Sequence, residues 1–148
     1  MRTVIFALPL LLATGGAAET VKVATDKTVV EAADALVAAI EGAGATVFAR
    51  VDHGAGAKSV GEDIGASQLV IFGNPKVGTP AMIESRETGL ALPLKVLVYE
   101  DTQGGVWFAY EDPAERLADL ADGALPPEVT APMAGALGNL TAKAAQSD

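Results

Sequence analysis

Residues 70–101, VIFGNPKVGTPAMIESRETGLALPLKVLVYED, decide the fold of this 148-residue chain. The stretch begins inside a short β-branched run at residues 68–73, which is bounded by turn residues and predicts a strand. Its second half contains LKVLVY at residues 94–99. In it Leu94, Val96 and Val98 alternate with Lys95, Leu97 and Tyr99, as side chains on the two faces of a strand do. A turn sequence follows at residues 101–105, and residues 106–111 alternate again. This part of the chain therefore predicts a β-hairpin.

Working outward, four further segments carry structural signals. Residues 20–25 alternate as a first strand does, and residues 45–52 predict a second. Between them, TVVE at residues 28–31 has capping-box spacing, and apolar residues recur at helical intervals until Gly42. The pair DP at residues 112–113 is typical of a helix N-cap followed by a proline in the first turn. It predicts a helix that runs through Leu120.

The expected order of elements is thus β-α-β-β-β-β-α, which makes residues 19–122 a single α+β domain. From residue 123 the composition shifts to Ala, Gly and Pro. In this C-terminal tail, residues 123–148, Met133, Leu137 and Leu140 share one stripe and predict a short helix. Gly135 and Gly138 each weaken a helix by about 1 kcal/mol relative to alanine. We expect this weak helix to be mobile or loosely docked.

Four motifs stand out together: FGNPK at 72–76, GTP at 78–80, LPLK at 92–95, and the pattern from VW at 106–107 to DP at 112–113. With these motifs the chain resembles the core of the bacterial domain-of-unknown-function family 302. The resemblance covers roughly residues 20–122. It implies a single, mainly antiparallel sheet with its main helices on one face, and it implies a homodimer. It implies no activity, because the family has none assigned.

The first eighteen residues have the organisation of a signal peptide. Arg2 supplies the positive charge, residues 4–12 are apolar, and GAA at 16–18 offers the small residues that a signal peptidase needs. We therefore expect residues 1–18 to be removed and the mature chain to start at Glu19. The protein would then be periplasmic or secreted, with no membrane attachment after cleavage.

The composition excludes several classes of partner and cofactor. With 19 acidic and 10 basic residues the formal net charge is -9, so the chain should repel nucleic acid. The sequence contains no cysteine, which excludes disulfides and thiol catalysis. Its single histidine has no acidic partners at ligand spacing. We expect no metal site and no cofactor.

The segment GNPKVGT at residues 73–79 resembles a phosphate-binding loop, but the lysine that should follow the second glycine is missing. Thr79 and Pro80 have the pattern of an N-cap and a first helical residue. A helix starting there would point free N–H groups toward Lys76, which suits a small anion. A rigid turn, in which glycine and proline only fix backbone angles, explains the same residues.

His53 directly follows the second predicted strand, at the start of a glycine-rich loop. This loop and the turn at residues 73–79 both leave the C-terminal ends of strands. We therefore expect His53, Asn74, Lys76 and Thr79 to form one ligand-binding site, with Lys76 holding a small anionic group. A hydrogen-bonded structural histidine remains an alternative for His53.

Two functional hypotheses follow. The first is an exported, homodimeric, non-catalytic binding or accessory protein that takes a small anionic ligand or a peptide. The second is an enzyme of unfamiliar type that uses His53 as general base on a small anionic substrate held by Lys76 or Lys95. We favour the first, because one possible base without an orienting carboxylate in a recognisable arrangement is a thin basis for catalysis. We assign no catalytic residue, since no serine lies in a nucleophile motif. Trp107 and Phe108, on opposite faces of the hairpin, indicate that a second subunit covers one face.

Overall fold

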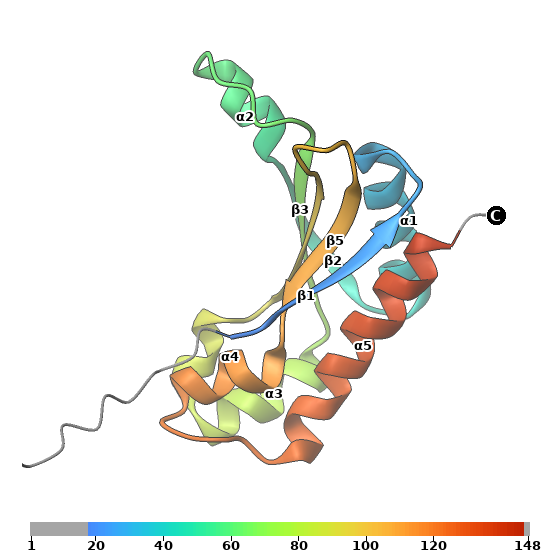
Figure 1. Ribbon diagram of the computed structural model, residues 1–148. Coiled ribbons are helices and arrows are strands. Elements are labelled where there is room, and N and C mark those ends of the chain that lie inside the picture. The colour runs from blue at the N-terminus through green and yellow to red at the C-terminus, as the bar shows by residue number, and fades with distance from the viewer. Residues whose placement is uncertain (1–17, 147–148) are drawn as a thin grey trace, which may run out of the picture.

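The computed structural model describes residues 18–146. Within them, five strands form one open, fully antiparallel sheet in the order β1-β5-β4-β3-β2 (Figure 1). The strands are β1 (Thr20–Thr25), β2 (Thr46–Asp52), β3 (Ser67–Gly73), β4 (Leu94–Glu100) and β5 (Val106–Glu111). The α+β class, the single domain and the predicted order of strands and main helices are confirmed.

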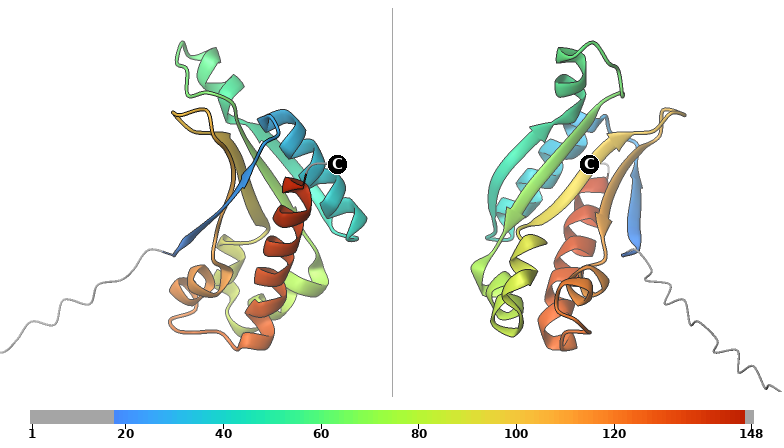
Figure 2. Two further views of the ribbon diagram at one scale, coloured as in Figure 1. Left: turned by 45° about the vertical axis from the view of Figure 1, so that its right-hand side comes forward. Right: turned by 90° about the vertical axis from the view of Figure 1, so that its left-hand side faces the viewer.

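The helices are α1 (Val29–Gly42), α2 (His53–Ser59), α3 (Pro75–Glu84), α4 (Pro113–Leu120) and α5 (Pro127–Ala145), with a 3-10 helix, η1 (Arg86–Leu90). Figure 2 shows that α1 and α5 lie side by side against one face of the sheet. Helices α3 and α4 lie at one end of the sheet, and α2 projects from the other end (Figure 1). The opposite face of the sheet, called the open face below, carries no helix in the described part of the chain.

Helix α1 begins as its sequence predicts. The Thr28 hydroxyl accepts a hydrogen bond from the Glu31 amide at 3.3 Å, and the Glu31 carboxylate accepts one from the Thr28 amide at 3.0 Å. This reciprocal pair satisfies two amide groups that the first turn of a helix leaves without partners. The apolar stripe of α1 then packs on the sheet, where Leu36 and Ile40 are fully buried.

The C-terminal helix is not the weak element that its glycines suggest. Helix α5 is 19 residues long, and Met133, Leu137 and Leu140 on its inner stripe are at most 7% exposed. Their burial is worth about 1.5–3 kcal/mol per side chain, which exceeds the cost of about 1 kcal/mol at each glycine. Tertiary packing therefore overrides intrinsic propensity. The expectation of a loosely docked tail helix was wrong.

The open face is built from three rows of side chains, because the register aligns every second residue of each strand. The aromatic row lies nearest the β4–β5 turn, the aliphatic row crosses the middle, and the charged row lies nearest α4. The aromatic row contains Ser67, Tyr99, Trp107 and Ala24; the aliphatic row contains Val51, Leu69, Leu97, Ala109 and Lys22; the charged row contains Ile71, Lys95, Glu111 and Thr20.

Candidate functional site: an apolar pocket under helix α3

The sheet register separates the residues that we expected to form one site. Strands β2 and β3 are antiparallel, with Asp52 opposite Gln68 at one end and Thr46 opposite Gly73 at the other. His53 follows Asp52, whereas Asn74 follows Gly73. The two loops are thus separated by the length of a seven-residue strand, about 20 Å at roughly 3.3 Å per residue. The expectation that His53 and Lys76 share a cleft was wrong, because the C-terminal ends of two antiparallel neighbouring strands lie at opposite ends of the sheet.

His53 is exposed at the first position of α2, far from the other three residues (Figure 1). The neighbouring carboxylate of Asp52 accepts a hydrogen bond from the Ala55 amide at 2.8 Å, so it caps α2 instead of bracing the imidazole. The general-base hypothesis required His53 to share a cleft with Lys76 and to be held by a carboxylate. Neither condition is met among the described residues.

Helix α3 begins five residues earlier than Thr79 and Pro80 suggested. The structure starts it at Asn74 and Pro75, which form an earlier cap-and-proline pair. The Asn74 side-chain carbonyl accepts from the Lys76 amide at 2.9 Å, and the Asn74 backbone carbonyl accepts from Val77 and Gly78 at 2.9 and 3.0 Å. These amides are therefore occupied. The expectation that free N–H groups point toward Lys76 was wrong.

Asn74 and Thr79 instead line a cavity of about 540 Å³, called the α3 pocket below. It lies between α3, α5, the end of the β2–β3 pair and the segment before β4. Lys76 does not line it. Its lining is mostly apolar and comprises Ala43, Ala45, Phe48, Phe72, Gly73, Asn74, Pro75, Val77, Gly78, Thr79, Met82, Leu92, Pro93, Leu94, Met133, Ala136, Asn139 and Leu140.

Two backbone features shape the side of the α3 pocket near Phe48. A register shift between Val47 and Ala49 marks an irregularity at Phe48, which lines the pocket and is 58% exposed. A Cβ atom at Gly73 would lie 3.3 Å from the Phe48 ring and 3.5 Å from Pro93. Any side chain at position 73 would therefore intrude between Phe48 and Pro93. The sequence offered no signal for this role of Phe48.

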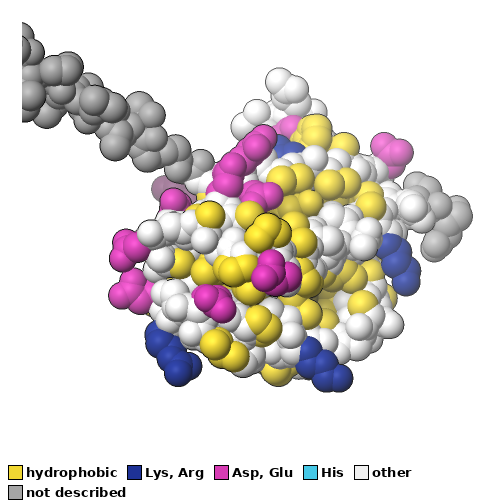
Figure 3. Space-filling model, turned by 90° about the horizontal axis from the view of Figure 1, so that it is seen from below, with side chains coloured by type: hydrophobic (Ala, Val, Ile, Leu, Met, Phe, Trp, Pro, Cys, Tyr) yellow, Lys and Arg dark blue, Asp and Glu magenta, His cyan; other side chains and the backbone are white. Residues whose placement is uncertain are grey.

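The polar groups of the α3 pocket are few and uncharged. They are the Asn74 amide, the Thr79 hydroxyl and the Asn139 amide. Asn74 has already used its carbonyl for the Lys76 amide, so its NH₂ group is the part left to donate. The space-filling view from below shows hydrophobic side chains across the middle of this end of the molecule, with basic side chains toward its edge (Figure 3).

Shifted pKa values lie outside the α3 pocket. Hydrogen bonds from the Trp107 indole, at 2.7 Å, and from the Gly105 and Gln103 amides lower the pKa of Asp101 in the β4–β5 turn. Burial raises the pKa of the Tyr110 hydroxyl. Trp107 is thus a structural part of its hairpin as well as a member of the aromatic row.

Within residues 18–146 no group of three or more histidine, aspartate or glutamate side chains is placed to hold a metal ion. No helix in the same range has both the length and the apolar character needed to span a membrane.

Together, the one-sided antiparallel sheet and the pocket beneath α3 define a small α+β domain with a largely apolar cavity. A crystal structure of an uncharacterized conserved DUF302 protein from Bacillus stearothermophilus shares this fold, with a TM-score of 0.73 at 18% identity over 84% of this chain and 97% of that one. The sequence profile of the family called "Domain of unknown function DUF302" matches residues 20–142. The chain belongs to this family, and the match includes most of α5.

Curated relatives carry a different kind of name. Proteins from Brucella suis and Brucella abortus, each named "Fluoride-specific ion channel FluC 1", are 44% identical to this chain over 94 residues. A Brucella melitensis protein named "Fluoride-specific ion channel FluC 2" matches equally well. The matched stretch covers 64% of this chain but only 35–37% of these relatives.

Proposed function

We propose that this protein is an exported, homodimeric binding protein whose ligand site is the α3 pocket, and that its ligand is an uncharged, mostly apolar small molecule. The observation that carries the proposal is the pocket itself, a cavity of about 540 Å³ whose lining is dominated by apolar side chains. Ligand sites in proteins commonly have volumes of about 300–1,000 Å³ and combine an apolar lining with a few placed polar groups.

The lining determines the ligand chemistry. No lysine, arginine, aspartate or glutamate of the described residues lines the α3 pocket. A charged ligand would lose its hydration without gaining a partner of opposite charge, which is costly. An apolar body against Phe48, Met82 and Met133 avoids that cost, and one or two neutral polar groups can bond with Asn74, Thr79 or Asn139. The thioethers suit ligands of irregular shape.

A pocket-filling variant tests this proposal. Ala136 lines the α3 pocket from α5, whereas Ala131 on the same helix is exposed and does not line it. We expect Ala136→Phe to weaken saturable binding of the neutral fluorophore Nile red at least tenfold, and Ala131→Phe to leave it within twofold. Equal affinities for both variants, measured by fluorescence titration, would contradict the α3 pocket as the site.

The homodimer is supported by the open face. Leu69, Leu97, Tyr99 and Trp107 remain partly exposed on it, with no covering element in the described chain. Contiguous apolar surface of this kind marks an interaction site, and a two-fold contact buries the same patch on both copies. A second copy of this chain is the occupant that we propose.

Val51 offers a test of the dimer that spares the Trp107 hydrogen bond. It is 39% exposed on the edge strand β2, and it lies on the open face opposite Leu69. Val51→Glu should give monomers by sedimentation velocity. Val30→Glu, on the outer side of α1 where Val30 is 53% exposed, should leave the dimer intact. A wild-type protein that is monomeric at micromolar concentration would refute this part of the proposal.

The curated relatives favour a second candidate function, in which the domain is an accessory to a membrane fluoride channel. Roughly two thirds of each Brucella channel lies outside the matched stretch, and we propose that fluoride conduction belongs to that part. Joining two modules in one chain raises their effective concentration to the millimolar range. A domain that is joined to a channel in one protein is a candidate partner of such a channel when the domain occurs as a separate chain.

This second candidate can be tested by reconstitution. The Brucella suis channel would be trimmed of its matched 94 residues and placed in vesicles. Addition of the present protein should change the rate of fluoride efflux, while a bovine serum albumin control should not. Unchanged efflux, together with no binding to the trimmed channel, would contradict the accessory function and leave the α3 pocket proposal unaffected.

A further inference from the structure

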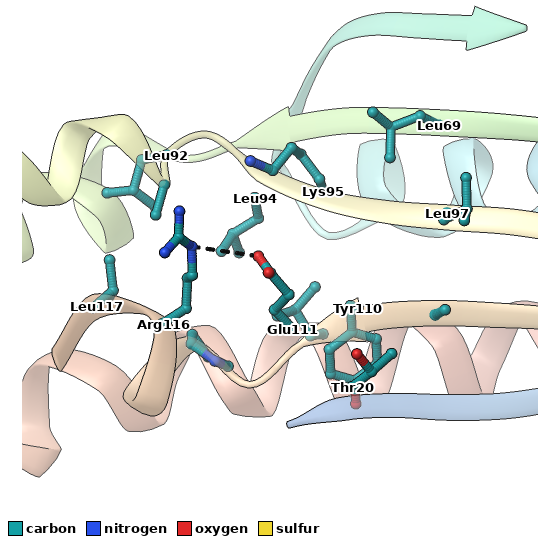
Figure 4. A pocket seen from close by; sticks show the side chains of 14 residues that line it. Thr20, Leu69, Leu92, Leu94, Lys95, Leu97, Tyr110, Glu111, Arg116 and Leu117 are labelled. Atoms are coloured by element: carbon teal, nitrogen blue, oxygen red, sulfur yellow. Dashed lines mark ion pairs between the residues drawn. The ribbon is translucent and has the colours of Figure 1, made fainter. Parts of the chain in front are cut away.

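A second cavity, of about 340 Å³, lies on the open face beside α4. We call it the sheet pocket, and Figure 4 shows it from close by. Its floor is formed by Leu69, Leu97 and Ala109 of the aliphatic row, and Leu92 and Leu117 line its other end. The sheet pocket and the α3 pocket share Leu92 and Leu94, but the rest of their linings differ.

Two cations line the same end of the sheet pocket. Figure 4 places the ammonium group of Lys95 and the guanidinium group of Arg116 on the same side, near Leu92, with Leu69 and Leu97 farther along the floor. Lys95 comes from the charged row of β4, and Arg116 comes from α4. Residues far apart in the sequence thus bring positive charge to one place.

This positive charge is only partly neutralised. Arg116 Nε lies 3.5 Å from a carboxylate oxygen of Glu111, and the two side chains are 37% and 53% exposed. Lys95 makes no ion pair with any residue in the range 18–146. The three side chains therefore carry a net charge of +1 beside an apolar floor, in a chain whose formal charge is -9.

We propose that the sheet pocket binds a small monocarboxylate with an apolar body. Its carboxylate would accept hydrogen bonds from Lys95 and from the outer nitrogens of Arg116, since Arg116 faces Glu111 with Nε. Its apolar body would cover the aliphatic row. A small anionic ligand was expected near Lys76, but the geometry points to Lys95 as the lysine that can hold it.

The balance of charge selects against other anions. A polyanion would meet a single excess positive charge locally and the repulsion of an acidic protein beyond it. A neutral apolar compound would leave Lys95 without a partner. The ion pair between Arg116 and Glu111 does not account for the position of Lys95 or for the cavity. An exposed ion pair contributes only about 0–1 kcal/mol to stability, and it needs no apolar surface beside it.

The sheet pocket is distinct from the α3 pocket and does not depend on it. Leu69 and Leu97 belong both to the sheet pocket and to the face that a second copy would cover, so the monocarboxylate and the second copy compete for these two side chains. The experiment therefore uses the protein in its natural assembly state, with sedimentation velocity recorded for every variant.

Octanoate is the probe, and 1-octanol is its uncharged counterpart. Lys95→Met keeps an unbranched side chain as far as the ε position and removes the charged amino group. Lys76→Met makes the same change of net charge at an exposed lysine that lines neither pocket. We expect calorimetric titration to give an octanoate Kd at least tenfold weaker for Lys95→Met and within twofold of wild type for Lys76→Met. Binding of 1-octanol should not change in Lys95→Met.

Three results would overturn the proposal. If wild-type protein does not bind octanoate, the proposed site does not exist. If Lys76→Met weakens octanoate binding as much as Lys95→Met does, the effect is one of general charge. Octanoate binding that survives Lys95→Met but is lost in Ala136→Phe places the probe in the α3 pocket. If Lys95→Met changes the assembly state, NMR shift changes of the Leu97 methyl groups in wild-type protein decide the question: no movement on adding octanoate counts against the site.

Discussion

Truncation of Leu137 should unfold the protein at a markedly lower temperature. Leu137 is 2% exposed and belongs to the main core together with α1 and the sheet. Leucine-to-alanine changes at such positions cost about 2–5 kcal/mol, because they lose transfer free energy and leave a cavity. For a domain of this size each kcal/mol corresponds to about 4 °C. Leu137→Ala should therefore lower Tm by roughly 8–20 °C.

Gly135→Ala on the same helix is the matched control. A Cβ atom at position 135 would meet nothing within 4 Å, so the substitution removes only the helix penalty of glycine. It should raise stability by about 0.5–1 kcal/mol, or roughly 2–4 °C. Both values are read from thermal unfolding by circular dichroism and checked by urea titration. A Leu137→Ala protein that melts within 2 °C of wild type would refute the account of α5 as a core helix.

Three further predictions concern separate parts of the chain. Folding lowers the pKa of Asp101 from 3.8, so its interactions stabilise the protein above about pH 3.8 and are lost as the pH falls through the lower folded pKa. The difference in unfolding free energy between wild type and Asp101→Asn, measured by urea titration, should therefore shrink on acidification. A difference that stays constant would contradict this. A Cβ atom at Gly54 would lie 2.7 Å from the Gly65 carbonyl oxygen, so Gly54→Ala should push the two segments apart and speed proteolysis of the α2 region. An unchanged cleavage rate would show that the close contact between residues 54 and 65 does not hold this region in place. The intact mass of exported protein should correspond to a chain that starts at Glu19, and a mass that retains residues 1–18 would remove the proposed export.

Most of the fold was readable because its signals are local. Capping at Thr28, alternation in the hairpin and the turn after Asp101 each depend on neighbours in the sequence, and the structure has them as expected. The docking of α5 was not readable, because it depends on burial against α1 and the sheet. Two helical glycines are visible in the sequence, whereas the surface that compensates for them is not.

The prediction of one shared site for His53 and Asn74 was wrong because it depended on the topology of the sheet. The sequence shows that His53 and Asn74 each follow a strand, and the family resemblance implies a mainly antiparallel sheet, but neither says that these two strands are paired neighbours. In a parallel pair the two loops would meet, and in the antiparallel pair observed here they lie at opposite ends. The start of α3 was missed for a simpler reason. Two cap-and-proline pairs stand five residues apart, and the earlier pair, Asn74 and Pro75, begins the helix.

The most direct test of the α3 pocket is native mass spectrometry of the protein purified from the compartment in which it resides. Wild-type protein should carry an uncharged, mostly apolar adduct of small-molecule mass, and Ala136→Phe prepared in parallel should lack it, while Ala131→Phe retains it. An adduct that persists unchanged in Ala136→Phe, or its absence from wild-type protein under conditions that preserve the fold, would contradict the account.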